Sequence, residues 1–478
     1  MGRIFVLLLS IFAFPAFGQE FEHKPVQGPA GGTPVKARNS KGSPWGFNND
    51  WLTVNSEDSL RDPKPEQWTT LGTEAYRKAK DAGIGFQRFV IGWDNMQSSG
   101  PDQEPIWNAA DGVIEQAKEN GIDTYIGFAS APAWATGGQG WYTVNACFFW
   151  EFNPLVQQMI TGFPFQSPEW ATAYTKMHAD GTYATKLAEL TAKYAPTPWD
   201  KPWGFLWDVA PCSVAKNYPV NSDLLKGFIG KLVNHYPAVR YWGFGNETRQ
   251  WPAGWDTTTD QNAKMAIDWL LVPGYEAVKA IDPRLMVVGP ESDGEPTYLE
   301  SILRQEDNFI KGGGHPFFDV ISLHLYAALN PLPASQQRYG HPEDALGYPD
   351  NAWYVFQHQI APLLDKYGRG RPVWLTEFGL GTHLYPDDLA KSDQVQADGL
   401  GAMIALAWTE MGVKHANWRL EKAFVYRLAD GRSPATPDVD WAGGCAIIYS
   451  DYPGYSPRPA WYKFEDFCPS RQTLPPAQ

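Results

Sequence analysis

Two glutamates in this chain each follow a short apolar run. Glu247 comes after 239–244 and the dipeptide Gly245-Asn246, and Glu377 comes after 373–375 and Thr376. Two carboxyl groups at the ends of two strands can break a glycosidic bond with retention, one acting as acid and then base, the other as nucleophile. The pattern therefore predicts that Glu247 and Glu377 are catalytic and face each other across one site.

The positions of both glutamates depend on short apolar segments that alternate with helical patterns. We expect strands at 45–48, 85–93, 123–130, 240–246, 285–290, 318–325, 373–377 and 423–428. Apolar residues at helical spacing predict helices at 73–82, 109–120, 223–236, 262–281 and 393–411. This alternation is typical of a parallel sheet. Eight strands predict an α/β fold, the (β/α)8 TIM barrel, with the glutamates on strands four and seven.

The chain divides into four segments by composition. Residues 1–18 begin with a charge, continue with a short apolar run and end in small residues, which predicts a secretory signal peptide rather than a membrane anchor. Residues 19–43 are rich in Gly, Pro and Lys and predict a flexible leader. A single catalytic domain is expected at 44–468, followed by a flexible tail at 469–478. Within the domain, 132–221 is a long insertion after strand 3.

The signal peptide predicts the location of the protein, and the net charge limits its partners. We expect a secreted or periplasmic protein that makes no membrane contact once the signal peptide is cleaved. The net charge of −14 argues against a nucleic-acid partner, because phosphates require a basic face. The oligomeric state stays open.

Aromatic residues indicate a carbohydrate substrate. The chain has 22 Trp, and aromatic residues make up 14% of it. Flat rings cover the apolar faces of sugars and leave the hydroxyls free for hydrogen bonds. Three tryptophans at strand ends are expected to face the substrate: Trp45, Trp93 and Trp134.

Four cysteines, Cys147, Cys212, Cys445 and Cys468, allow three disulfide pairings. Export permits disulfides, and we favour Cys147–Cys212 with Cys445–Cys468, because each bridge would close a local excursion; buried thiols are the alternative. No metal and no cofactor is expected, because no His-x-x-x-His spacing and no phosphate-binding glycine loop is evident.

The order of several short motifs resembles the clan A glycoside hydrolases, which are (β/α)8 retaining enzymes. The resemblance covers about 44–468 and is loosely closest to families 39 and 5. The motifs that carry it are Gly245-Asn246-Glu247, Thr376-Glu377-Phe378-Gly379, Ser322-Leu323-His324-Leu325-Tyr326, Arg88 and the terminal segment 457–462.

The resemblance implies a role for each matching residue. Glu247 matches the acid/base, whose pKa should be raised so that it stays protonated, and Glu377 matches the nucleophile. Asn246 matches the amide that binds the sugar 2-hydroxyl, and Arg88 matches a cation that keeps the nucleophile ionised. The strand-six pair, His324 and Tyr326, is expected near the nucleophile, with Tyr326 hydrogen-bonded to its carboxylate.

Two departures affect the sugar subsite. Thr248 stands where many clan members have proline after the acid/base, and no tryptophan ends strand eight. Either Tyr426 or Trp418 could supply the missing ring.

The sequence favours a secreted retaining glycoside hydrolase that cleaves a β-linked oligo- or polysaccharide by double displacement. Two alternatives stay open. A transglycosylase would use the same carboxylates with a sugar hydroxyl in place of water, and a non-catalytic glycan-binding protein could use the same barrel, since a fold alone does not fix a function.

Overall fold

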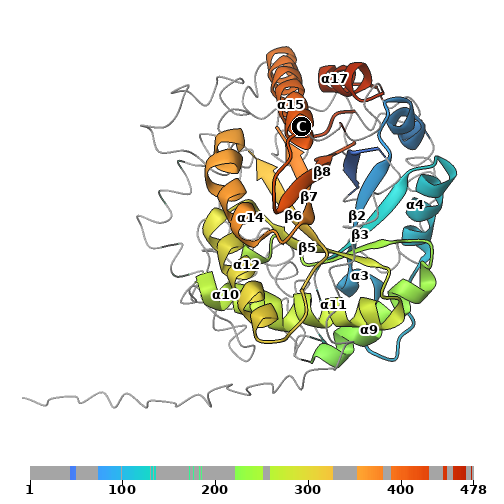
Figure 1. The fold of residues 1–478 in the computed structure, drawn as a ribbon. Helices are drawn as coiled ribbons and strands as arrows, with labels where there is room; N and C mark the ends of the chain where they lie inside the picture. Colours follow the sequence, from blue (N-terminus) through green and yellow to red (C-terminus); the bar gives the residue numbers. More distant parts are fainter. Residues whose placement is uncertain are drawn as a thin grey trace, which may run out of the picture. The chain divides into compact units, whose positions relative to one another are not determined.

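Eight parallel strands close into a barrel in the computed structural model of this chain (Figure 1). The structure describes residues 43–49, 74–97, 100–129, 131, 132, 134, 135, 172, 176, 182, 185, 221–250, 259–326, 352–380, 389–429, 445–448, 456–469 and 475. These all fall within one unit, 39–478. Each strand pairs in parallel with the next, and β8 pairs with β1. The predicted α/β barrel is therefore confirmed.

All eight strands overlap the segments that the sequence predicts. They are β1 (Trp45–Asn49), β2 (Phe86–Gly92), β3 (Asp123–Ala129), β4 (Tyr241–Phe244), β5 (Met286–Ser292), β6 (Val320–Tyr326), β7 (Arg371–Gly379) and β8 (Trp418–Val425). The main difference is in β8, which begins five residues before the predicted 423–428. Its first half alternates between buried and half-buried positions, so it lacks the continuous apolar run that marks a fully buried strand.

Helices surround the strands (Figure 1). They are α3 (Trp93–Met96), α4 (Asn108–Glu119), α9 (Ser222–His235), α10 (Thr259–Ala266), α11 (Val272–Ile281), α12 (Pro296–Lys311), α14 (Ala361–Tyr367), α15 (Leu389–Met411) and α17 (Pro459–Phe467). Residues 74–81 are also helical, and π-helical turns lie at Ile267–Leu271 and Phe356–Ile360. Among the described residues, no helix has the length and apolar character needed to cross a bilayer.

The inside of the barrel is filled by a separate group of buried side chains. Phe86, Tyr125, Trp374 and Phe424 pack together there with Val288 and Val320. Their rings meet largely edge to face, as between Phe86 and Trp374 with centroids 6.0 Å apart. Because the interior is solid, a ligand has room only at the strand ends, and the carboxyl ends are where barrel enzymes place their sites.

Several predictions fall on residues that lie outside the described part of the chain. They include the signal peptide at 1–18, nearly all of the leader at 19–43, most of the insertion at 132–221 and most of the tail at 469–478. Cys147 and Cys212 also lie there, so their pairing stays a prediction.

The predicted bridge between Cys445 and Cys468 is wrong, because no disulfide bond joins them. Both side chains are buried, but they belong to opposite ends of the barrel. Cys468 ends α17 beside Gly83, which precedes β2, whereas Cys445 lies near enough to the Tyr326 hydroxyl at the carboxyl end of β6 to act on it electrostatically.

Gly243 of β4 and Gly127 of β3 are register partners, but only one of them has room for a side chain. A methyl group on Gly243 would overlap the Tyr125 hydroxyl, whereas one on Gly127 would lie 3.4 Å from Val90 Cγ2. We predict that Gly243→Ala lowers the free energy of unfolding by about 1–3 kcal/mol, because Tyr125 must move inside a packed barrel. Gly127→Ala should stay within about 1 kcal/mol of wild type. Urea unfolding measures both, and equal stabilities would contradict this packing.

Candidate active site

The backbone after β4 fixes the position of Glu247. The strand ends at Phe244, and the chain turns through Gly245 with φ +92°, where any Cβ would overlap the Thr248 methyl group. Glu247 itself has φ +48°, which is uncommon for a residue with a side chain. Its N–H donates to the Glu291 carbonyl oxygen at 2.9 Å. This hydrogen bond ties the turn to β5 and holds Glu247 at the carboxyl end of the barrel.

Glu377 lies near the end of β7, next to the chain of β6. An irregularity in the pairing of these two strands at Leu323 and His324 brings His324 opposite Glu377. The Tyr326 hydroxyl donates to Glu377 Oε2 at 2.6 Å, the hydrogen bond that the family resemblance implied. Glu377 is thus held by two side chains of β6.

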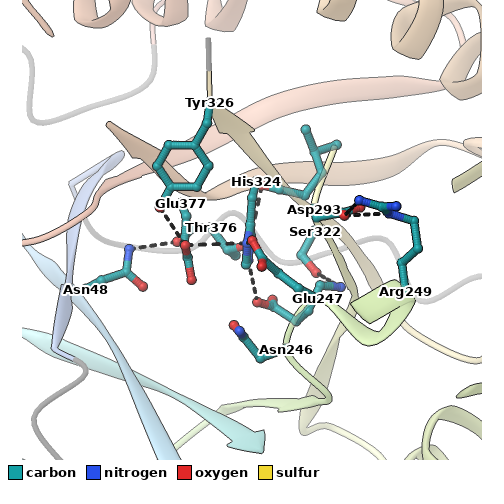
Figure 2. A network of polar contacts seen from close by, with 12 residues as sticks. Asn48, Asn246, Glu247, Arg249, Asp293, Ser322, His324, Tyr326, Thr376 and Glu377 are labelled. Atoms are coloured by element: carbon teal, nitrogen blue, oxygen red, sulfur yellow. Dashed lines mark hydrogen bonds and ion pairs between the residues drawn. The ribbon is translucent and has the colours of Figure 1, made fainter. Parts of the chain in front are cut away.

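Glu247 and Glu377 face each other across a short gap (Figure 2). One oxygen of each carboxylate and one nitrogen of His324 all lie within 4.8 Å of one another. The side chains of Glu247 and Glu377 are 18% and 8% exposed, whereas the side chains of Arg88, His324 and Glu291 around them are fully buried. The two predicted catalytic groups are therefore the members of this charged cluster that a ligand could reach.

Arg88 is the buried cation of the cluster and contacts three other strands as well as Asn246, which follows β4. Its Nη1 donates to Glu377 Oε1 at 2.6 Å and to Asn48 Oδ1 at 2.8 Å. Its Nη2 donates to Asn246 Oδ1 at 2.5 Å and lies 2.7 Å from Glu291 Oε2. The ion pair with Glu377 is the one that the sequence resemblance implied.

His324 lies between three carboxylates. Its Nδ1 is 2.8 Å from Glu247 Oε1 and 3.4 Å from Glu377 Oε2, and its Nε2 is 3.2 Å from Glu291 Oε2. Burial alone would lower the pKa of His324, but Glu377, Glu247 and Glu291 together raise it to about 10. At neutral pH the ring is therefore an imidazolium that carries a proton on each nitrogen.

The charge on His324 lowers the pKa of Glu247, whereas the sequence resemblance implied a raised pKa. Burial raises the pKa of Glu247, but the hydrogen bond and charge of His324, followed by the charges of Arg88 and Arg249, outweigh burial and bring the pKa below its ordinary value. The prediction of a raised pKa for Glu247 is therefore wrong. Arg249 is itself held by Asp293, whose Oδ2 accepts from its Nε at 2.6 Å.

Glu291 is a third carboxylate that the sequence analysis missed. It lies one residue beyond the predicted end of strand five, with φ +55° and a fully buried side chain. Burial raises its pKa, but Arg88 and then His324 and Tyr125 bring the pKa to about 2. The hydroxyl of Tyr125 donates to its Oε1 at 2.6 Å. A carboxylate directly after the apolar run 285–290 was the available signal.

Glu247, His324 and Glu377 form the one group among the described residues whose ligand atoms lie close enough to hold a metal ion. A metal needs an unprotonated imidazole nitrogen. Both nitrogens of His324 instead face carboxylates, and its raised pKa keeps them protonated. These residues therefore fit a proton and ion-pair network better than a metal centre.

Two of the predicted aromatic substrate contacts, Trp45 and Trp93, are wrong. Trp45 and Trp93 are fully buried: Trp45 stacks on Trp408, and Trp93 stacks on Phe228. They pack in the core and cannot touch a sugar, because a strand-end position does not reveal which way a ring points.

The other three aromatic residues differ in their surroundings. Trp418 is also buried, at the start of β8, with its Nε1 donating to Asp365. Trp134 is half-buried against Trp93 and stays a prediction. So does Tyr426, which is half-buried with its ring centroid 6.1 Å from that of Tyr326.

No protein-family model matches this chain, and no curated protein matches it. Solved structures do match, including a family 39 glycoside hydrolase from Bacteroides cellulosilyticus WH2, which is 15% identical with a TM-score of 0.47. That match covers 88% of this chain and 62% of the other, so this chain spans less than two thirds of the family 39 enzyme.

Two further matches have similar scores. GH5_18 from Streptomyces cattleya in complex with GlcNAc is 15% identical, with a TM-score of 0.49 and 91% and 82% of the two chains covered. A double mutant of the β-glucosidase from Trichoderma harzianum is 13% identical, with a TM-score of 0.47 and 90% and 98% covered. Families 39 and 5, which the motifs indicated, are thus both among the matched structures; the similarity is one of fold.

Replacing His324 tests the charged network. The folded protein keeps a proton on His324 up to about pH 10, whereas an unfolded histidine releases it near its ordinary pKa of 6.5. The stability that this proton contributes is therefore fully present below pH 6.5 and is lost as the pH rises through 10. We predict that His324→Asn costs about 3 kcal/mol at pH 6, because it removes a buried cation that three carboxylates share, and that the cost shrinks toward pH 10.

Urea unfolding of wild type and variant at pH 6, 8 and 10 measures this difference. His358→Asn, at an exposed histidine outside the site, is the control and should show no such trend. A cost for His324→Asn that is the same at all three pH values would show that His324 is neutral in the folded protein.

Proposed function

We propose that this protein is a retaining glycoside hydrolase that cleaves a β-linked oligo- or polysaccharide by double displacement. The observation that carries the proposal is the short distance between Glu247 and Glu377, whose nearest oxygens lie within 4.8 Å of each other. Retaining enzymes separate their carboxyl groups by about 5 Å, whereas inverting enzymes need roughly 6.5–9.5 Å to admit a water molecule. The gap here fits direct attack by one carboxylate.

Glu377 is the proposed nucleophile because it is the more firmly held of the two. Arg88 and Tyr326 each contact one of its oxygens at 2.6 Å, which fixes the plane of the carboxylate beneath an anomeric carbon. Glu377 attacks that carbon as the glycosidic bond breaks, and a glycosyl ester forms. Water then attacks the same carbon and releases Glu377.

Glu247 is the proposed acid and base. It lies on the opposite side of the gap and is the more exposed of the two carboxylates, as a group that meets the leaving sugar must be. It delivers a proton to the glycosidic oxygen in the first step and takes one from water in the second.

Asn246 is proposed to bind the sugar beside these two groups. Because its Oδ1 accepts from Arg88, the side chain is oriented with its amide nitrogen available as a donor toward a sugar hydroxyl. Tyr426 is the proposed ring that covers an apolar sugar face. Assays on a panel of glycosides and polysaccharides identify the sugar and its linkage.

We also propose that the protein is exported, on the basis of the predicted signal peptide at 1–18. Expression in a host with a general secretory system should then yield a mature chain that begins at Gln19, because the small residues before it form the expected cleavage site. Intact-mass measurement of the exported protein checks this, and a chain that keeps residues 1–18 would contradict it.

Assays on aryl β-glycosides and β-linked polysaccharides test the activity, and variants test the roles. Glu377→Gln should abolish turnover, because a neutral amide in place of the carboxylate cannot form the glycosyl ester. Glu247→Gln should lower kcat by about 10²–10⁴-fold on substrates with poor leaving groups. Glu300→Gln, at a partly exposed carboxylate on α12, is the control and should behave as wild type.

Azide separates the two roles. With azide, Glu247→Ala should form a β-glycosyl azide and Glu377→Ala an α-glycosyl azide, because azide replaces water in the first variant and the nucleophile in the second. Wild-type rates in Glu377→Gln would refute the proposal. Sugar transfer to an added acceptor at the expense of hydrolysis would favour a transglycosylase, and binding without cleavage would favour a glycan-binding protein.

A further inference from the structure

Glu291 has contacts that a merely structural carboxylate would not need. Its side chain is fully buried and meets Tyr125, Arg88 and His324. Its carbonyl oxygen accepts from the N–H of Glu247, and its own N–H donates to the Ser322 hydroxyl at 2.8 Å. Through backbone and side chain together, Glu291 contacts Arg88, His324 and the backbone of Glu247.

The side-chain contacts form a line. Glu291 Oε2 lies 3.2 Å from Nε2 of His324, and Nδ1 of the same ring lies 2.8 Å from Glu247 Oε1. A carboxylate behind an imidazole fixes which ring nitrogen exchanges its proton, because the other nitrogen stays bonded to the carboxylate. We propose that Glu291 is a positioning residue that fixes His324 as the store of the proton that Glu247 delivers to the glycosidic oxygen. This inference rests on the proposed function.

The charges of Glu247 and His324 at neutral pH explain why a separate proton donor is needed. Glu247, with its lowered pKa, is ionised at neutral pH and has no proton of its own to give. His324, with a pKa of about 10, holds one on Nδ1. The groups facing the ring are Glu247 after β4, Glu291 on β5 and Glu377 on β7, with Arg88 of β2 beside the last two. Their arrangement places the transferable proton between His324 and Glu247.

The proton and bond changes balance over both steps. In the first, the bond from the anomeric carbon to Glu377 forms and the glycosidic bond breaks. The Nδ1 proton passes to Glu247 and from it to the leaving oxygen, so His324 becomes neutral and keeps its Nε2 proton toward Glu291. In the second, water attacks, the ester bond to Glu377 breaks, and the proton from water passes through Glu247 back to Nδ1.

The charge of Glu377 determines when His324 releases its proton and when it takes the proton back. Its charge is the largest influence that favours the imidazolium, and its Oε2 lies 3.4 Å from Nδ1. When Glu377 becomes an ester it loses that charge, so His324 releases its proton as the leaving group needs it. When the ester breaks the charge returns, and His324 takes the proton back. Glu291 stays charged throughout, so the ring keeps its orientation.

Glu291→Gln tests the role, because it keeps the size of the side chain but removes the charge behind the ring. We expect kcat/KM on glycosides with poor leaving groups to fall by about 10²-fold, with little change on dinitrophenyl glycosides, whose leaving groups need no proton. The alkaline limb of the pH profile should move to lower pH by about one unit or more, because His324 loses an anion that holds its proton. Glu291→Asp, which keeps the charge, should return the alkaline limb most of the way to its wild-type pH.

Glu306→Gln is the matched control. Glu306 is also a fully buried carboxylate paired with an arginine, Arg371, but this pair lies at the start of β7, away from the gap. It should lose stability without a shift of the alkaline limb or a new dependence on the leaving group. If Glu291→Gln behaves in the same way as Glu306→Gln, Glu291 is structural and the inference is wrong.

A direct measurement covers the case in which Glu291→Gln does not fold. Nitrogen NMR of histidine-labelled wild type, with the His324 signals assigned by their loss in His324→Asn, should show both nitrogens protonated from neutral pH to about pH 9. A neutral ring at pH 7 would overturn the inference. The NMR measurement needs no turnover and is therefore independent of the glycoside assays. Inactivity of wild type in those assays would refute the proposed function but not the protonation of His324.

Discussion

The guanidinium of Arg88 is the interaction on which the site depends. It is fully buried, and its two terminal nitrogens contact Asn48 of β1, Asn246 after β4, Glu291 of β5 and Glu377 of β7. A charge inside a protein is tolerable only where it is paired and hydrogen-bonded. The barrel meets this requirement by bringing the ends of several strands to one cation. The same contacts that satisfy Arg88 thereby set the positions of the groups that face a ligand.

The cluster around Arg88 carries an excess of negative charge. Three carboxylates, those of Glu247, Glu291 and Glu377, face one guanidinium and one imidazolium. Bond cleavage at an anomeric carbon builds positive charge on the sugar, and a prearranged anionic site stabilises such charge without reorganisation. Glu291 is fully buried, whereas the side chains of Glu247 and Glu377 are 18% and 8% exposed, so these two are the carboxylates of the cluster that a ligand could reach. Positive φ angles at both Glu247 and Glu291 show that the backbone accepts strain to keep this arrangement.

Much of the fold could be predicted from the sequence, because a parallel barrel buries its strands on both faces and leaves continuous apolar runs that are easy to recognise. The carboxyl ends of such runs meet at one edge, so Glu247 and Glu377 could be placed together from spacing alone. Glu291 was missed because the turn-like sequence Glu291-Ser292-Asp293-Gly294 hides the last residues of β5. The ring directions of Trp45 and Trp93 depend on packing with distant residues such as Trp408 and Phe228, which local spacing does not show.

The lowered pKa of Glu247 could not be predicted from local sequence either, because it depends on His324 from another strand.

We propose above all that Glu377 becomes covalently bonded to the sugar while Glu247 lies across the gap. Incubation of wild type with an activated fluorosugar that traps the glycosyl-enzyme, followed by digestion and tandem mass spectrometry, tests it most directly. We expect one label per chain, on Glu377. A label on Glu247 or Glu291, or the absence of any label on an enzyme that turns over the parent glycoside, would contradict it.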